Sequence, residues 1–408
     1  MLTFAEAQAQ VLEHIEPLSV ERVPAGEAMG RVLATEVAAR GDSPPLDNSA
    51  MDGYAVRHAD VSAASAAAPV SLEVLEDIPA GHVGTRPVGP GQASRIMTGA
   101  PIPAGADTVI RVEDTRAADG RVEILVPDEL GGSVRAAGSS MRAGETVLPA
   151  GTEIGVAEVA VLAAVQRSHV SVYRRPVVAI LSTGDELVEA DDTPGPGQIV
   201  NVNSPGLAAL ARHCGAEALV LPTAPDDEGV IRTAVEAALQ GDFIISSGGV
   251  SVGDYDYVKR VLEELDAREV LWRVAMKPGK PLYFALLQGR PYFGLPGNPV
   301  SSLVSFLHFV RPAIRRAAGF APDRLRLPEL RVPLEHDLAN DDAGRAQFLR
   351  GQVRPDGAGH LTARAVARAQ GSHVLTSMLG ANALLRLEAG QCARAGDEVA
   401  AHLFGELS

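Results

Sequence analysis

The segment FIISSGGVSVGDYDYVKRVLEEL, residues 243–265, places a short apolar run, a glycine-rich turn and a helical run one after another. Further strand-like runs at 177–181, 218–221, 269–275 and 281–287 alternate with helical runs at 203–215, 226–241 and 299–319. This alternation predicts a mainly parallel sheet with helices on both faces. In such sheets, ligands bind beyond the carboxyl ends of the strands. The centre of the chain is therefore predicted to be a doubly wound α/β domain with a site at that edge.

Three Gly-rich or Pro-rich turns follow apolar runs in this region: STGDEL (182–187), SSGG (246–249) and KPGKP (277–281). Among 36 basic residues only Lys259, Lys277 and Lys280 are lysines. Lys277 and Lys280 flank a Pro-Gly turn that would aim two compact ammonium groups at one point, which suits contact with an anion. The alternative is a chance cluster on a solvated loop.

Acidic residues accompany these turns. The carboxylates lie in three pairs, which are Asp185 and Glu186, Asp226 and Asp227, and Asp254 and Asp256. Carboxylates and lysines at one sheet edge suit an anionic, phosphorylated ligand held with a divalent cation, for which Mg²⁺ is the preferred candidate. Asp226 and Asp256 are equally well explained as helix N-caps.

Composition narrows the class of protein. A length of 408 residues predicts two to four domains, and a net charge of −15 argues against a general nucleic-acid binder. Cys214 and Cys392 are too few for a disulfide framework, and no zinc motif is present. No run is long enough to span a membrane, and residues 3–16 predict an amphipathic helix rather than a signal peptide. A soluble, cytoplasmic protein is predicted.

Changes in the sequence pattern predict four domains. They are a split N-terminal domain (1–40 and 139–173), an inserted β-rich domain (41–138), the α/β domain (174–320) and a small β-barrel-like C-terminal domain (321–408).

Two stretches of the inserted domain carry candidate functional groups. The loop around Pro44 and Pro45 gathers acidic and amide side chains that end at Asp52, which would ligate a hard cation or merely form Asx turns. Thr98 ends the apolar run of RIMTGAPIP (95–103), where the simpler interpretation is a tight turn with a bulge.

Taken together, these stretches resemble a known family. DNSAMDGYAV (47–56), RIMTGAPIP, STGDEL, SSGGVSVGDYDYVK (246–259), MKPGKPLYF (276–284) and GLPGNPVSS (294–302) look like the signature stretches of molybdopterin molybdenumtransferases. That family includes the C-terminal half of gephyrin and its plant counterpart. GRAQFLRG (344–351) and QGSHVLTSM (370–378) resemble its last domain, so the resemblance covers nearly the whole chain.

The resemblance implies a transferase of molybdenum cofactor biosynthesis that inserts molybdate into adenylylated molybdopterin and releases AMP. It implies a requirement for a divalent cation, an elongated homodimer, a possible partnership with the molybdopterin adenylyltransferase, and an α/β domain similar to that enzyme's fold.

The resemblance also implies roles for particular residues. Lys277, Lys280 and Pro281 would contact molybdate or the phosphates of the organic substrate, and Arg350 and Ser372 would belong to the same oxyanion site. Glu186, Asp226 and Asp256 match active-site carboxylates, with Glu186 and Asp256 as metal ligands, and Asp52 and Thr98 would reach the cleft from a partner subunit. The remaining candidates for contact with the cofactor are Ser247, Gly248, Gly249, Arg273, Pro296 and Pro299.

Two departures from the family pattern bear on activity. Ser139 and Ser140 stand where the family usually carries carboxylates, and Arg273 stands where lysine is expected. The sequence therefore leaves two alternatives open: a molybdopterin adenylyltransferase, and a ligand-binding paralogue or scaffold without turnover. It does not decide the metal or the choice between molybdate and tungstate.

Overall fold

The computed structural model describes residues 1–248, 257–366 and 369–407. The chain divides into two compact units. Unit 1 comprises Met1–Thr35, Ala150–Val156 and His169–Ser408, and unit 2 comprises Glu36–Pro149 and Ala157–Ser168. The finer division into four domains stays a prediction.

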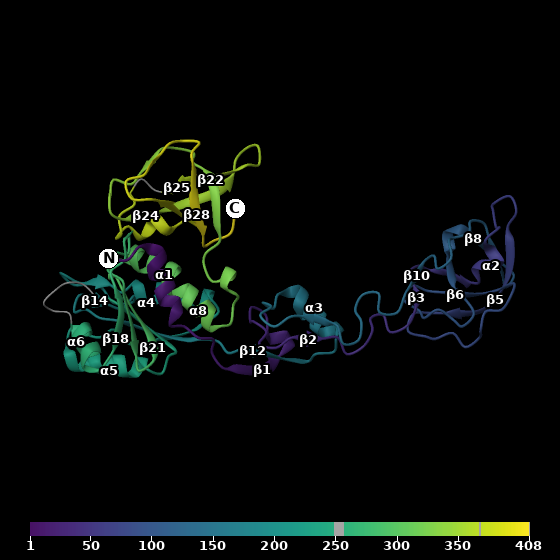
Figure 1. The fold of residues 1–408 in the computed structure, drawn as a ribbon, viewed down its shortest axis with the longest axis horizontal. Helices are drawn as coiled ribbons and strands as arrows, with labels where there is room; N and C mark the ends of the chain where they lie inside the picture. The colour runs from purple at the N-terminus through teal and green to yellow at the C-terminus, as the bar shows by residue number, and fades with distance from the viewer. Residues whose placement is uncertain (249–256, 367–368, 408) are drawn as a thin grey trace. The chain divides into compact units, whose positions relative to one another are not determined.

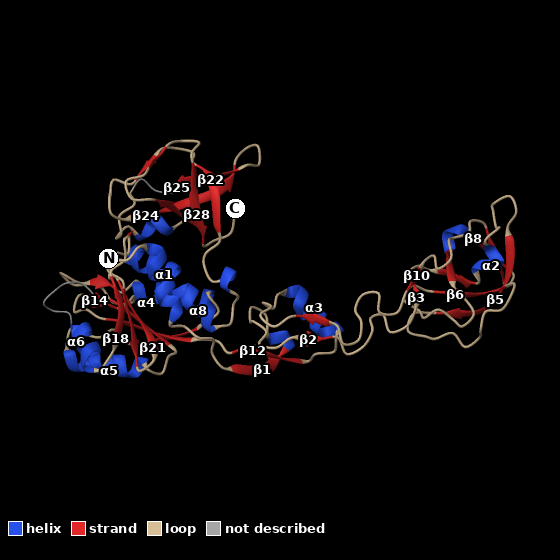
Figure 2. Ribbon diagram, in the orientation of Figure 1, coloured by secondary structure: helices blue, strands red, loops and turns tan. Residues whose placement is uncertain are grey.

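A six-stranded sheet forms the centre of unit 1 (Figures 1 and 2). Its strands, in spatial order, are β16 (Glu217–Val220), β13 (Val177–Ser182), β17 (Phe243–Ser247), β21 (Arg290–Leu295), β20 (Tyr283–Leu287) and β18 (Arg268–Trp272). The first four run parallel, whereas β20 is antiparallel to both of its neighbours. The predicted mainly parallel sheet is confirmed, with one antiparallel strand.

Helices cover both faces of this sheet (Figure 1). On one face, Ile180, Ile245 and Phe293 share a buried core with α1 (Phe4–Glu13), α4 (Asn203–His213), α7 (Pro299–Ser305) and α8 (Arg311–Ala317). On the other face, Ala179 and Ile244 pack with α5 (Glu228–Ala238) and α6 (Tyr257–Glu264). A π-helical segment, Phe306–Val310, joins α7 to α8, so the predicted helix 299–319 is continuous but not uniform.

The N-terminal helix is fixed at its start by a capping box. The Thr3 side chain accepts a hydrogen bond from the Glu6 backbone, and the Glu6 carboxylate accepts one from the Thr3 backbone. Phe4, Val11 and Ile15 then lie in the core of the α/β sheet. Beyond the helix, β1 (Val20–Pro24) pairs antiparallel with β12 (His169–Tyr173).

A second six-stranded sheet forms the C-terminal part of unit 1. Its order is β19 (Met276–Lys277), β24 (Ala346–Pro355), β26 (Ala383–Leu387), β28 (Glu398–Leu403) and β22 (Glu329–Pro333), with β25 (Leu361–Ala365) also paired to β24. Because β19 lies between β18 and β20 in the chain, its pairing with β24 ties the α/β domain to the C-terminal sheet. Two small ladders complete unit 1: β14 (Leu187–Val188) with β15 (Ile199–Val200), and β23 (Leu338–Ala339) with β27 (Cys392–Ala393).

Unit 2 is rich in strands, as the sequence predicts. Its sheet has the order β7 (Thr108–Arg111), β4 (Gly53–Val56), β6 (Gln92–Ile96), β5 (Val70–Ile78), β9 (Arg121–Ile124) and β8 (Thr115–Ala118). The short pairs β3 (Asn48–Ser49) with β10 (Val134–Arg135) and β2 (Val37–Ala38) with β11 (Thr146–Leu148) also lie there, as does helix α2 (His58–Val61). Helix α3 (Val156–Ala164) begins at the boundary between the units. Across the residues described, no helix has the length and apolar character needed to cross a membrane.

Two histidines are buried where α1, the π-helical segment and the C-terminal sheet meet. The rings of His308 and His402 lie 5.2 Å apart between centroids, and Phe4 and Phe348 pack against His308 at 4.9 and 4.4 Å. Burial holds the pKa of His308 well below its usual value, and burial lowers the pKa of His402 to about 4 even though Glu329 opposes that shift. Both imidazoles are therefore neutral in the folded protein at neutral pH.

This arrangement predicts a loss of stability in mild acid. Because both folded-state pKa values lie below the unfolded value near 6.5, the unfolded chain binds more protons, and stability falls as the pH drops from 6.5 towards 4. Replacing His308 with Leu should reduce the fall in the urea midpoint between pH 7 and pH 5. The exposed His336→Gln variant serves as the control. Equal pH dependence in wild type and His308→Leu would contradict the assignment.

Candidate functional site

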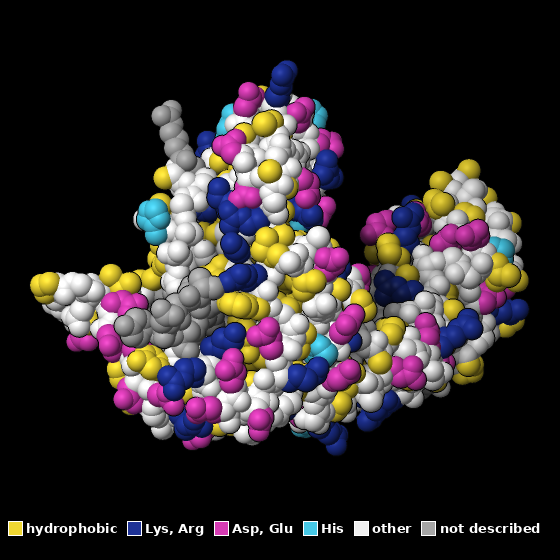
Figure 3. All heavy atoms as spheres, turned by 60° about the vertical axis from the view of Figure 1, so that its left-hand side comes forward, with side chains coloured by type: hydrophobic (Ala, Val, Ile, Leu, Met, Phe, Trp, Pro, Cys, Tyr) yellow, Lys and Arg dark blue, Asp and Glu magenta, His cyan; other side chains and the backbone are white. Residues whose placement is uncertain are grey.

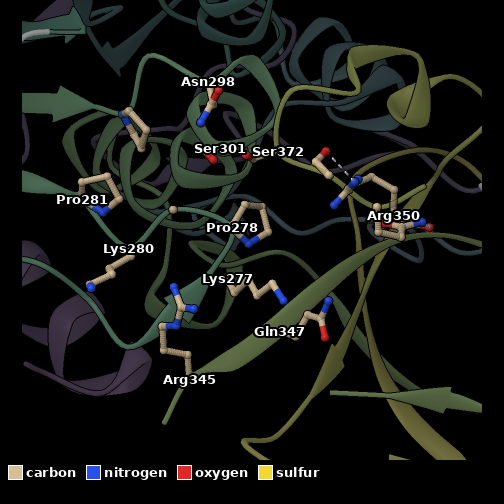
Figure 4. A pocket seen from close by; sticks show the side chains of 14 residues that line it. Lys277, Pro278, Lys280, Pro281, Asn298, Ser301, Arg345, Gln347, Arg350 and Ser372 are labelled. Atoms are coloured by element: carbon tan, nitrogen blue, oxygen red, sulfur yellow. Dashed lines mark hydrogen bonds between the residues drawn. The ribbon is translucent and has the colours of Figure 1, made fainter. Parts of the chain in front are cut away.

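A cavity of about 360 Å³ lies between the lysine turn and the C-terminal sheet. Four basic side chains line this cation-lined cavity: Lys277 and Lys280 from the turn, and Arg345 and Arg350 at β24 (Figure 4). The space-filling view in Figure 3 shows Lys and Arg side chains gathered on this part of unit 1. The rest of the lining consists of Pro278, Gly279, Pro281, Pro296, Asn298, Ser301, Gln347, Gln370, Gly371 and Ser372. The chemistry of this lining suits a small, multiply charged anion.

Backbone geometry fixes the lysine turn. Gly279 has a φ of +103°, and a Cβ there would lie 2.7 Å from the Oγ of Ser305 on α7. The carbonyl of Lys280 accepts hydrogen bonds from the backbone N–H groups of Val274 and Leu282, both at 3.0 Å. The turn is therefore seated against α7, and both lysines line one cavity although their side chains extend in different directions in Figure 4.

Arg350 is the most deeply buried charge of this cavity. Its side chain is fully buried, with Nε donating to Ser377 Oγ at 2.9 Å and Nη2 donating to the Gly371 carbonyl at 3.2 Å. Desolvation lowers the pKa of Arg350 to about 10, and this guanidinium pairs with no carboxylate in the described part of the chain. A buried cation without a counter-ion favours binding of an anion.

The Gln370 amide holds the strand that carries this arginine. Its Oε1 accepts from the Arg350 backbone N–H at 2.9 Å, and its Nε2 donates to the Arg350 carbonyl at 3.1 Å. The following loop turns back to α7, where the N–H of Val300 donates to the Ser372 carbonyl at 3.0 Å. Both sides of the cavity are thus joined by backbone hydrogen bonds.

A second, larger cavity of about 660 Å³ shares Asn298 with the first. Of the predicted site residues, Glu186, Ser247, Gly248 and Pro299 line this polar cavity. The remaining lining residues are Thr183, Leu187, Ile199, Val200, Asn201, Val202, Asn203, Gly297, His373 and Leu375. Because Ser372 lines the first cavity and His373 the second, one loop of the C-terminal domain borders both.

Two asparagines of this cavity went unrecognised in the sequence. Asn203 donates from Nδ2 to Ser247 Oγ and to the Gly297 carbonyl, both at 2.7 Å, while its buried Oδ1 has no partner among the described residues. The Oδ1 of Asn201 accepts from the N–H of Ser204 at 3.1 Å at the start of α4. The polar run NVNS (201–204) directly before a helix was the available signal. The free oxygen of Asn203 is an acceptor for a ligand group or a hard cation.

Other predicted site residues of unit 1 lie elsewhere. Asp226 is exposed, and its backbone N–H donates to Asp185 Oδ1 at 3.0 Å, whereas Asp227 caps α5. The Arg273 guanidinium stacks on the Trp272 ring at 4.2 Å and lines neither cavity. Gly249, Asp254 and Asp256 lie outside the described residues. In the ranges that are described, no cluster of three or more His, Cys, Asp or Glu side chains suits a metal ion.

In unit 2, the structure brings Asp52 and Thr98 together. Asp52 Oδ1 accepts from the backbone N–H and the hydroxyl of Thr98, at 2.7 and 2.8 Å. These hydrogen bonds lower the pKa of the Asp52 carboxyl, with the backbone donor as the main cause. In the same loop region, Asp42 and Asp47 accept backbone hydrogen bonds from Ala143 and Ala137. Their observed contacts hold the loop in place.

Family comparisons match almost the whole chain. Residues 2–165 match the model described as MoeA N-terminal region (domain I and II), residues 179–316 match the probable molybdopterin binding domain, and residues 331–404 match the MoeA C-terminal region (domain IV). A molybdopterin molybdenumtransferase of Nostoc sp. is 46% identical over 80% of this chain and 75% of its own length. One from Haemophilus influenzae is 34% identical over 95% of both chains.

Solved structures agree with the fold. The crystal structure of a molybdopterin biosynthesis MoeA protein from Pyrococcus horikoshii covers all of both chains with a TM-score of 0.82 and 32% identity. A second structure of the protein from that organism gives a TM-score of 0.85 and 30% identity over 99% of this chain and all of its own. The predicted multidomain α/β and β architecture is therefore confirmed.

The geometry of the lysine turn predicts a difference between two glycines. Gly289 also has a positive φ, of +77°, but a Cβ there would meet open space. We expect Gly289→Ala to cost about 1 kcal/mol from backbone strain alone. Gly279→Ala should cost about 1–3 kcal/mol more, because its Cβ crowds Ser305. Denaturant unfolding of the two variants measures the difference, and equal costs would show that the seat against α7 is unimportant.

Proposed function

Because this chain belongs to the MoeA family, whose curated relatives are molybdopterin molybdenumtransferases, we propose that it inserts molybdate into adenylylated molybdopterin and releases AMP. The observation that carries the proposal is the cation-lined cavity, where a desolvated Arg350 lies without a carboxylate partner among the described residues. Molybdate is a compact dianion of the kind that this lining attracts.

The charges of the cavity address the main electrostatic difficulty of the reaction. Bringing a dianion to a sulfur-containing ligand that also bears phosphates accumulates negative charge at one place. Lys277, Lys280, Arg345 and Arg350 are positioned to offset that charge before the reaction begins. Buried or backbone-anchored cations do this without reorganisation, because their geometry is already fixed.

The polar cavity supplies the neighbouring subsite for the organic substrate. Gly248 has a φ of +93° and presents backbone without a side chain, which permits close approach by a phosphate. The polar cavity shares Asn298 with the cation-lined cavity. A ligand that fills both cavities would therefore place one end beside the oxyanion. Ser247 and Pro299 line the polar cavity, and Pro296 lines the cation-lined cavity.

The oxygen donors of the polar cavity fit a magnesium ion. Glu186 and the unpartnered Oδ1 of Asn203 would hold it, together with Asp256 as the sequence predicts. A bound Mg²⁺ would neutralise phosphate charge on the substrate. The protein's own part is to present the oxygens of Glu186 and Asn203 in this cavity.

The two alternative functions differ from the proposed one in the substrates they require and in whether turnover occurs. A molybdopterin adenylyltransferase requires ATP. It has no use for a site that binds a free oxyanion, such as the cation-lined cavity. A paralogue without turnover would retain ligand binding and lose only catalysis, which the serines at 139 and 140 leave open. An assay that combines substrate, molybdate and metal separates all three.

The direct test follows AMP release from adenylylated molybdopterin on addition of molybdate and Mg²⁺. We expect release by the wild type, none after chelation of the metal, and none from Lys277→Ala, which should remain folded because Lys277 is exposed. Lys259→Ala is the matched control, since that lysine stacks on Trp272 outside both cavities.

Each alternative outcome has a clear meaning. Molybdate-independent release or ATP-dependent adenylylation would contradict the proposal, and tight binding without AMP release would indicate the paralogue. Wild-type turnover by Lys277→Ala would remove the lysine turn from the oxyanion site.

We also propose that the protein acts in the cytoplasm as a homodimer in which Asp52 and Thr98 complete the site of a partner subunit. The adenylyltransferase that makes its substrate is the natural partner enzyme, and nucleic acid and membrane are not expected partners. Support comes from the Asp52–Thr98 hydrogen bonds, which present an ionised carboxylate at an exposed position.

Mixing two inactive variants tests the shared site. Asp52→Ala and Lys277→Ala should each be inactive alone. After the subunits exchange, a mixed dimer contains one intact site, so activity should return towards about one quarter of the wild-type level if subunits pair at random. Absence of recovery in a verified heterodimer would show that Asp52 does not complete the partner's site.

A further inference from the structure

An ion pair stands at the wall of the cation-lined cavity. Arg345 Nε donates to Asp342 Oδ2 at 2.7 Å, and Arg345 Nη2 donates to the same oxygen. The side chains are only 30% and 20% exposed, so solvent screens this pair less than a fully exposed one. Arg345 lines the cavity (Figure 4), whereas its partner Asp342 is not among the lining residues. One of the four cavity cations therefore already has a counter-ion.

The loop that carries this pair is held rigidly. Asn340 is 1% exposed, and its Nδ2 donates to the carbonyls of Arg345 at 2.8 Å and Glu388 at 2.9 Å. The N–H of Gly344 donates to Asp342 Oδ1 at 3.1 Å. Directly after Arg345, β24 pairs with the strand of Lys277. The position of the carboxylate relative to the lysine turn is thus set by the fold.

The Asp342 carboxylate interacts with two cations of the cavity. The hydrogen bond from Arg345 is the main cause that lowers the pKa of Asp342, and the positive charge of Lys277 lowers it further. The same carboxylate repels an oxyanion that enters the cavity, because both groups are negatively charged. Arg350 differs, because it pairs with no carboxylate among the described residues.

We propose that Asp342 is the resident counter-ion of the cation-lined cavity, a positioning residue that holds Arg345 and limits how tightly the oxyanion binds. The inference rests on the proposed function for the identity of the oxyanion. It has a catalytic reason: an oxyanion bound too tightly before the reaction stabilises the ground state as much as the transition state. By weakening the binding of the oxyanion, the Asp342 carboxylate would leave it able to react with the organic substrate.

The test measures the dissociation constant of molybdate, and separately of tungstate and sulfate, by titration calorimetry. Asp342→Asn removes the charge and keeps an acceptor for the Gly344 N–H. We expect this variant to bind molybdate about tenfold more tightly. Asp342→Glu should restore affinity towards that of the wild type, and Arg345→Gln should weaken binding.

Two comparisons separate the ion pair from a general charge effect. Asp341→Asn makes the same charge change at the adjacent exposed residue and should leave affinity nearly unchanged. In the Arg345→Gln background, Asp342→Asn should have a smaller effect than in the wild type, because the two residues act as a unit.

The outcomes distinguish this inference from the proposed function. Unchanged or weaker binding by Asp342→Asn, or an equal gain with Asp341→Asn, would overturn the inference, as would an undiminished effect without Arg345. Wild-type protein that binds sulfate but not molybdate would contradict the proposed function alone. In that case the sulfate titrations of the same variants still decide the role of Asp342.

Discussion

The pairing of β19 with β24 is the constraint on which the candidate site depends. It is a short parallel contact, Met276 with Ala346 and Lys277 with Gln347, yet it joins a segment between two strands of the central sheet to β24 of the C-terminal sheet. The Ala346 N–H also donates to the Ala275 carbonyl at 3.1 Å just beside it. Together with the Val300–Ser372 hydrogen bond, this contact fixes the spacing between the lysine turn and β24, which carries Arg350 and directly follows Arg345.

Burial of Arg350 and the fixed backbone of the lysine turn strengthen the effect of these charges. A surface cluster of four cations would be screened by water and salt, and would bind a dianion weakly. Here Arg350 is fully buried, and Lys277 and Lys280 project from a turn that α7 and the surrounding backbone hold in place. The acidic protein as a whole, at a net charge of −15, thus contains a local region with the opposite preference. That contrast favours small anions over polyanionic nucleic acid.

The structure also gives different surroundings to acidic residues that look alike in the sequence. Glu186 lines the polar cavity, whereas Asp227 caps a helix and Asp185 accepts a backbone N–H. Asp342 accepts hydrogen bonds from an arginine and is not among the residues that line the cation-lined cavity. Sequence spacing does not distinguish these cases, because each depends on which backbone donors or cations lie nearby in space.

The sequence by itself determined the alternation of strands and helices, the β-rich character of the flanking regions and the placing of two lysines at one Pro-Gly turn. Each of these rests on local periodicity, on turn chemistry or on residue composition, which neighbouring residues specify. Only the tertiary structure decided that Arg345 joins the cation-lined cavity, that Asn203 has a free buried oxygen and that Arg273 stacks on Trp272 instead. Those outcomes depend on contacts between segments far apart in the chain, and on which charges are left unpaired once the segments have packed.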